Sequence, residues 1–212
     1  LVAAGLYDRN RQCPLSAAPL NVGVVTSLAS AAWADFLHEI ERSGRGFALK
    51  VIDVRVQGER AVEEVTAAIR TLAGNPELDV IAVVRGGGGR TELATFDHEA
   101  IATAIALSPL PVFTGLGHEI DRAVADEVAH TALKTPTACA AALVEAVQAF
   151  QVATAQAWAD ITRRGDLRLA EAVGEVTDIA QQLRHRVLAA VWRSGERLGQ
   201  RRQPLAQGGC IG

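Results

Sequence analysis

The sequence predicts an α/β fold: a doubly wound parallel sheet of about four strands with helices on both faces, followed by a long C-terminal helix. Short β-branched apolar runs alternate with amphipathic segments of helical length over residues 22–129. Strands and helices that alternate at this spacing form parallel sheets through right-handed crossovers. From residue 135 onward the pattern becomes alanine-rich helix. We therefore expect an α/β domain at residues 1–150, a helical segment at 151–203 and a disordered tail at 204–212.

Local signals place the individual elements in chain order. Pro14 and Pro19 disfavour regular structure in residues 1–20. Residues 27–30 can cap a first helix, and the run Gly74-Asn75-Pro76 ends a second one. The predicted strands lie at residues 22–26, 48–56, 79–84 and 111–114, and the predicted helices at residues 31–42, 61–72, 96–107 and 120–129.

The expected strand order places function at one edge of the sheet. We predict the order 2-1-3-4, with the first and third strands side by side and the direction of winding reversed between them. In open parallel sheets, ligands bind beyond the carboxyl ends of the strands near such a reversal. The segments at that edge are residues 26–28, 85–90 and 115–121. We therefore look for binding and catalytic side chains there.

The segment at residues 85–90 has the composition of a phosphate site. Four consecutive glycines need a reason to be ordered, such as a positive φ or close approach of the backbone to a ligand. Backbone amides left uncovered between two arginines suit a phosphate, although a flexible surface connector is the alternative interpretation. Neither a P-loop nor a complete dinucleotide fingerprint is present. The residues concerned are Arg85, Gly86, Gly87, Gly88, Gly89 and Arg90.

The segment at residues 115–121 and the first helix carry candidates for proton transfer. His118 lies three residues before Asp121 at a predicted helix start, and histidine can give or take a proton near neutral pH. Asp35 and His38 have the same spacing and share one helix face, which could equally be a solvated surface. A histidine in a loop is also commonly structural, so the motif alone leaves both interpretations open.

A third polar group follows the His118 segment in the chain. Asp126, Glu127 and His130 fit either a solvated surface or a supporting layer behind a catalytic loop. A metal site made from His118, Asp121 and Asp126 is conceivable, but the spacing matches no strong ligand signature. We therefore predict no metal site.

Composition limits the partners and the compartment. The net charge of −3 gives no global basic footprint for nucleic acid. Three cysteines at unrelated spacing fit neither a disulfide framework nor a zinc site. We find no signal peptide and no stretch of membrane-span length, which favours a cytoplasmic protein without a membrane partner. The sequence has no methionine, so we expect it to be a piece of a longer protein.

The C-terminal segment has the period of a supercoiling helix. Apolar residues recur there at alternating steps of four and three, although alanine dilutes the stripe. An ordinary helix packed on the domain is the alternative interpretation. If the helix leaves the domain, we expect the chain to dimerise through it, or to bend at Gly165 or Gly174 and dock. The stripe consists of Leu169, Val173, Val176, Ala180, Leu183, Val187 and Ala190.

Taken together, these motifs resemble those of the exodeoxyribonuclease VII large-subunit family. The resemblance covers nearly all of residues 1–150 in the same order and implies a catalytic domain followed by the start of a coiled coil. The matching pieces are Val22-Gly23-Val24-Val25-Thr26-Ser27, Asp35-Phe36-Leu37-His38, Val56-Gln57-Gly58, Arg85-Gly86-Gly87-Gly88-Gly89, Phe96-Asp97, Pro111-Val112-Phe113, Gly117-His118-Glu119-Ile120-Asp121, Ala125-Asp126 and Thr135-Pro136-Thr137.

The resemblance implies an exonuclease that degrades single-stranded DNA from both ends to oligonucleotides and nucleoside 5′-phosphates. It implies no strict metal requirement, which leaves room for stimulation by Mg²⁺. Small subunits would bind the C-terminal helix, and a homodimer of this chain is left open. The implied catalytic set is Asp35, Arg85, His118 and Asp121, and the implied phosphate-binding or DNA-binding set is Ser27, Gly86, Gly87, Gly88, Gly89 and Arg90.

Two positions depart from the family pattern, and two other functions stay open. Gly89 stands where the family usually has serine, and Ala94 stands where many members have tryptophan. These changes remove a hydroxyl from the phosphate loop and a stacking surface for a base, so we expect a weaker grip on substrate. An enzyme of the same fold that binds a nucleotide or sugar phosphate is the alternative function. A mainly scaffolding role is the third.

Overall fold

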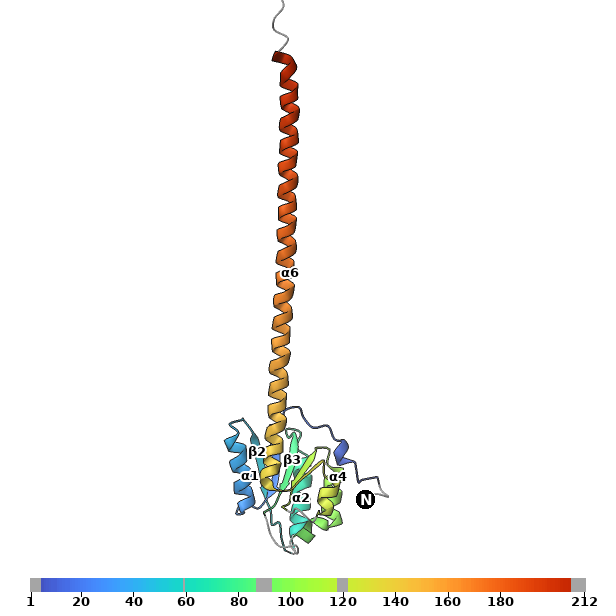
Figure 1. The fold of residues 1–212 in the computed structure, drawn as a ribbon. Coiled ribbons are helices and arrows are strands. Elements are labelled where there is room, and N and C mark those ends of the chain that lie inside the picture. The colour runs from blue at the N-terminus through green and yellow to red at the C-terminus, as the bar shows by residue number, and fades with distance from the viewer. Residues whose placement is uncertain (1–4, 59, 87–92, 118–121, 207–212) are drawn as a thin grey trace, which may run out of the picture. The chain divides into compact units, whose positions relative to one another are not determined.

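The computed structural model describes residues 5–58, 60–86, 93–117 and 122–206, the last seven by backbone alone. Five parallel strands form one sheet in the order β2-β1-β3-β4-β5. Figure 1 shows this sheet with strands β2 and β3 labelled. The strands are β1 (Asn21–Thr26), β2 (Ala48–Asp53), β3 (Val80–Val84), β4 (Val112–Gly115) and β5 (Thr131–Leu133). The helices are η1 (Asn10–Gln12), α1 (Ala31–Arg42), α2 (Ala61–Ala73), η2 (Ala94–Asp97), α4 (Glu99–Leu107), α5 (Val124–Val128) and α6 (Pro136–Ala206).

The predicted α/β class and the strand order 2-1-3-4 are confirmed. Helix α1 has the predicted bounds because Ser30 caps it: the Ser30 hydroxyl accepts a hydrogen bond from the Trp33 amide at 3.2 Å. The fifth strand, β5, was not predicted. It has only three residues, all of them half-buried, and it lacks the apolar run by which the other strands are recognised.

Two predicted helices are shorter in the structure. The single helix predicted at residues 96–107 is wrong, because His98 has an extended backbone (φ −72°, ψ 132°) that separates η2 from α4. The His98 Nδ1 atom accepts a hydrogen bond from the Ala100 amide and so starts α4. In place of the helix predicted at residues 120–129, α5 begins at Val124 and ends before Ala129, whose backbone is extended. Residues 118–121 lie outside the described part of the chain.

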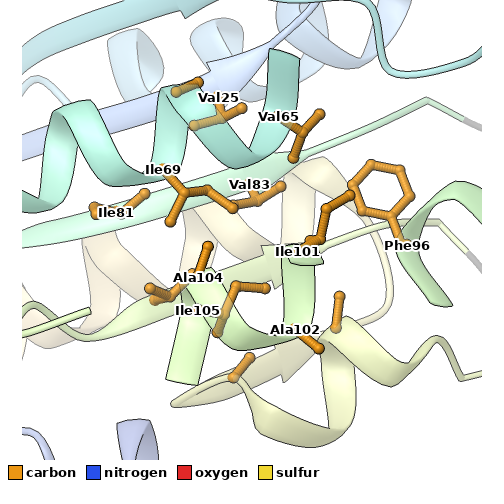
Figure 2. Close-up of a cluster of buried hydrophobic side chains, with 14 of the residues drawn as sticks. Val25, Val65, Ile69, Ile81, Val83, Phe96, Ile101, Ala102, Ala104 and Ile105 are labelled. Carbon is orange, nitrogen blue, oxygen red and sulfur yellow. The ribbon is translucent and has the colours of Figure 1, made fainter. Parts of the chain in front are cut away.

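Two buried clusters cover the two faces of the sheet. Val25 packs with side chains of α2, η2 and α4 on one face (Figure 2). Val22 and Val24 pack on the other face with Phe36 of α1 and Leu143 of α6. Alternate residues of a strand point to opposite faces, so β1 contributes to both clusters. The prediction of helices on both faces is therefore confirmed, and each large aliphatic side chain stabilises the fold by roughly 1.5–3 kcal/mol through burial.

Helix α6 is a single element whose residues belong to two compact units. Its first turns belong to the compact unit Leu1–Ala153, in which Cys139 and Leu143 are buried. The second unit, Thr154–Gly212, contains the rest of the helix, and its side chains from residue 154 to 199 are exposed. The helix continues through residues 204–206, which were predicted as tail, and residues 207–212 lie outside the described part.

By length and composition alone, α6 contains a segment that could cross a membrane. The expectation that no stretch approaches this length is therefore corrected. The core helix of a soluble protein meets the same criterion, and the first turns of α6 are core in this chain.

Candidate active site

The carboxyl ends of β1, β3 and β4 bring three predicted functional segments to one edge. Val84 of β3 pairs with Gly115 of β4, and the Arg85 amide donates a hydrogen bond to the Gly115 carbonyl oxygen at 3.1 Å. The Arg85 side chain is buried, with 2% of its surface exposed. A buried arginine is uncommon, and it places a permanent positive charge where β3 ends. Arg85 therefore stays a candidate for anion binding at this edge.

Gly86 and Gly117 let the loops that begin here approach their neighbours closely. A Cβ atom at Gly86 would lie 3.5 Å from the Ala32 Cβ atom, so the glycine loop starts against the first turn of α1. Gly117 has a φ of +86°, a conformation that residues with side chains rarely adopt. A Cβ atom there would lie 3.5 Å from the Arg85 carbonyl oxygen. The glycine loop and the His118 segment therefore begin side by side.

Ser27 and Asp35 lie on the turn and helix that follow β1. The Ser27 carbonyl oxygen accepts hydrogen bonds from the Ser30 hydroxyl at 2.6 Å and from the Ser30 amide at 3.0 Å. These bonds shape the turn that leads into α1. Asp35 is exposed and lies one turn beyond Ala32, the residue next to Gly86. His38 is exposed on the same helix, as expected for the solvated alternative.

Two carboxylates accept hydrogen bonds from residues that follow the His118 segment. Asp126 Oδ1 accepts a hydrogen bond from the Thr114 hydroxyl at 2.5 Å, and Asp126 Oδ2 accepts one from the Ala123 amide at 3.2 Å. Asp97 Oδ1 accepts a hydrogen bond from the Val124 amide at 2.9 Å. Burial raises the pKa of Asp126, and the hydrogen bond from Thr114 opposes that rise. The sequence left the role of Asp126 ambiguous, whereas the structure shows that its carboxylate links β4 to the residue before α5.

Comparison with known proteins shows the family of this chain. The family described as exonuclease VII, large subunit, matches residues 6–208. The chain belongs to the exonuclease VII large-subunit family. Among curated relatives named exodeoxyribonuclease 7 large subunit, the protein of Vibrio cholerae is 39% identical over 140 residues, which cover 66% of this chain and 31% of the relative. The protein of Geotalea uraniireducens is 32% identical over 218 residues, which cover 93% of this chain and 49% of the relative.

A third relative, from Ralstonia nicotianae, is 40% identical over 140 residues, which cover 66% of this chain and 32% of the relative. The chain thus spans about a third to a half of the length of these exonuclease VII large subunits. The family resemblance inferred from the motifs is confirmed, and the matched residues include all of α6 as well as the α/β domain.

Several of the predicted exonuclease VII site residues lie outside the described residues. The structure brings together Arg85, Gly86 and the start of the His118 segment. The sequence also predicts that the side chains of Arg85, His118 and Asp35 converge on one cleft, and this stays a prediction. Ala94, which replaces the usual family tryptophan, is exposed at the start of η2. The site residues outside the described part are Gly87, Gly88, Gly89, Arg90, His118 and Asp121.

Sequence reasoning missed the contribution of the N-terminal segment. Asn10 is fully buried, and its side chain bonds to the carbonyl oxygens of Ser108 and Leu110 and to the amides of Val112 and His130. One asparagine thus satisfies backbone groups at the amino ends of β4 and β5. No periodic pattern marks such a residue, because its role depends on partners about 100 positions away.

Tyr7 connects the same segment to α5. The Tyr7 hydroxyl donates a hydrogen bond to Glu127 Oε2 at 2.5 Å, and the Arg11 guanidinium lies 5.2 Å from the centre of the Tyr7 ring. The hydrogen bond from Tyr7 lowers the pKa of Glu127. The described residues contain no group of three or more His, Cys, Asp or Glu side chains arranged to hold a metal ion.

Proposed function

We propose that this chain hydrolyses single-stranded DNA from both ends to oligonucleotides and nucleoside 5′-phosphates. The observation that carries the proposal is Arg85: a buried cation at the carboxyl edge of the sheet, directly before the glycine loop, in a chain of the exonuclease VII large-subunit family. A positive charge fixed at this edge can bind a phosphodiester and stabilise the charge that develops during its hydrolysis.

The reaction adds water across a phosphodiester bond. The water oxygen attacks phosphorus, the bond to the 3′ oxygen breaks, and that oxygen takes a proton while the phosphate stays on the 5′ carbon. Arg85 and the amides of the glycine loop would hold the phosphate and offset its charge. His118 would transfer the proton, and Asp121 or Asp35 would orient His118 or activate the water.

The proposal includes no strict metal requirement. A fixed guanidinium and backbone amides can supply the charge stabilisation that divalent ions supply in other nucleases. Mg²⁺ could still stimulate the reaction by screening the DNA backbone. We further propose that the protein acts in the cytoplasm, where single-stranded DNA is accessible.

We also propose that small subunits of exonuclease VII bind the exposed part of α6. Its apolar stripe includes Leu169, Val176 and Leu183, which are 65%, 67% and 61% exposed. Exposed apolar side chains at heptad spacing are typical of helices that pair with other helices. Retention of the small subunit by the wild-type chain, and its loss when Leu183 and Val187 become glutamate, would support this assignment.

Incubation of end-labelled single-stranded oligonucleotides with the chain in excess EDTA tests the activity. We expect shortening from either label, and a loss of about 100-fold or more in Arg85→Ala and in His118→Ala, since such groups typically contribute factors of this size. Arg70→Ala is the matched control, because Arg70 is exposed in the last turn of α2, away from the carboxyl edge.

The stability of each variant must be measured in parallel, because Arg85 is buried and its loss could unfold the domain. Arg85→Lys retains a positive charge, so comparing it with Arg85→Ala separates the effect of losing the charge from the effect of losing the packing of the side chain. An intact oligonucleotide in the presence of folded wild-type chain, together with a rise in Tm on adding mononucleotides, would overturn the nuclease and favour the phosphate-binding alternative.

A further inference from the structure

We propose that Asp126 is a positioning residue for the hydrolysis. Its carboxylate ties the strand that leads into the His118 segment to the residues that leave it, and so fixes the base of that loop. The catalytic consequence of this tie rests on the proposed function, whereas the tie itself rests on the contacts of described residues alone.

The two oxygens of Asp126 bind opposite ends of the loop. Oδ1 accepts from the hydroxyl of Thr114, a fully buried residue in β4, one position before the strand ends at Gly115. Oδ2 accepts from the amide of Ala123, the residue just before α5. One side chain therefore binds a residue before the His118 segment and a residue after it.

Two further contacts hold the same two ends. Gly117 lies against the Arg85 carbonyl oxygen on the entering side, and the Asp97 carboxylate accepts from the Val124 amide on the leaving side. The chain from Gly117 to Ala123 covers six residue steps and can span at most about 22 Å. Fixing both of its ends therefore limits where a proton-transfer group within it can lie.

Helix capping alone does not account for these contacts. An acidic residue in the first turn of a helix commonly accepts a hydrogen bond from the amide at the helix start, as Asp126 does from Ala123. Capping does not require the bond to Thr114, which ties the helix to the centre of the sheet. Glu63 gives a direct comparison, because it is also an acidic residue in the first turn of a helix, α2, but its side chain is exposed.

Hydrogen exchange of the folded chain tests the tie without reference to activity. We expect amides in a peptide covering residues 116–124 to exchange at least about 10-fold faster in Asp126→Ala and in Thr114→Val than in wild type, because a bond that closes the loop base is lost. In Asp126→Asn, Oδ1 can accept from the Ala123 amide while Nδ2 donates to the Thr114 hydroxyl oxygen, so this variant and Thr114→Ser should keep the slow exchange. Glu63→Ala, the matched control, should leave this peptide unchanged, and unchanged exchange in Asp126→Ala would overturn the proposal.

Steady-state hydrolysis, measured well below the Tm of each variant, tests the catalytic consequence. We expect Asp126→Ala and Thr114→Val to lower kcat by about 10- to 100-fold with KM for the oligonucleotide nearly unchanged, because the loop is misplaced while Arg85 still holds phosphate. Rescue by Asp126→Asn and wild-type kcat in Glu63→Ala separate positioning from general destabilisation. Faster exchange with unchanged kcat would overturn the positioning role. If the wild-type chain leaves DNA intact, the proposed function and the catalytic role of Asp126 are both overturned. The hydrogen-exchange experiment would still show whether Asp126 links the two ends of the segment.

Discussion

At the scale of single residues, Gly115 allows the end of β4 to lie close to the first turn of α6. A Cβ atom there would lie 2.9 Å from the Thr135 carbonyl oxygen and 3.0 Å from the Cys139 Cβ atom. Burial raises the pKa of the Cys139 thiol to about 12, so this neighbour is a neutral core group. Neither contact can move easily, because one is backbone and the other lies in the buried first turns of α6.

Gly115→Ala should therefore destabilise the domain by about 1–3 kcal/mol, the usual effect of overpacking. It should also lower hydrolysis, because the Gly115 carbonyl oxygen accepts the hydrogen bond from the Arg85 amide. Chemical denaturation measures the first effect. Gly46→Ala is the control, since a Cβ atom there has no neighbour within 4 Å among the described residues. Equal stability of the two variants would contradict the close approach.

Asp126 should make stability depend on pH in a defined direction. Burial raises its folded-state pKa above the ordinary value of about 3.9, so the folded state binds the proton more readily than the unfolded state. The stability that results is present below pH ~3.9 and is lost as pH rises through the raised folded value. Asp126→Asn lacks this dependence, so its Tm relative to wild type should increase between about pH 3 and pH 7. A Tm difference that stays constant over this range, measured by calorimetry, would contradict the assignment.

The residues of the candidate site divide by how far their partners lie along the chain. Arg85 was predicted because a local signal, an apolar strand followed by glycines, marks it. Asn10 was missed and Asp126 was left ambiguous, because their structural roles depend on hydrogen bonds to residues far away in the sequence. Ser108 and Thr114 are such partners, and only the fold places them within hydrogen-bond distance. Long-range hydrogen bonds leave no periodic trace in a sequence.

At the scale of elements, strong local signals gave correct bounds and weak ones did not. Helix α1 was predicted to the residue because a capping serine precedes it and Ala32, Phe36 and Ile40 are buried at helical spacing. The break at His98 was missed because apolar residues continue on both sides of it. Strand β5 forms through pairing with β4, and its three residues have no pattern of their own.

Gly174 offers a test of the exposed part of α6. The helix is continuous through Gly165 and Gly174, where the sequence suggested a bend, and a Cβ atom at Gly174 would meet none of the described residues within 4 Å. Alanine in a helix is favoured over glycine by about 1 kcal/mol. Gly174→Ala should therefore raise the helical circular dichroism signal and its melting temperature. A decrease would indicate that a bend at this position stabilises the protein.

At the scale of the whole molecule, the chain combines two units with different means of stabilisation. Unit Leu1–Ala153 buries two apolar clusters around its sheet and is stabilised by its own packing. In unit Thr154–Gly212, the large apolar side chains of residues 154–199 are exposed along the helix. An isolated helix gains little from hydrogen bonds alone, since most helix stability in proteins comes from packing an apolar face. The second unit is therefore expected to bind another chain.

In the absence of small subunits, that other chain should be a second copy of this protein. Leu183 and Val187 lie in the apolar stripe and are 61% and 53% exposed, so two copies can bury them against each other. Analytical ultracentrifugation should show a dimer for wild type and a monomer for Leu183→Glu with Val187→Glu. The matched control is His185→Glu with Leu188→Glu, which places two glutamates on the opposite face of the same turns. A monomer for wild type at micromolar concentration, or dissociation by the control as well, would mean that the stripe does not pair with itself.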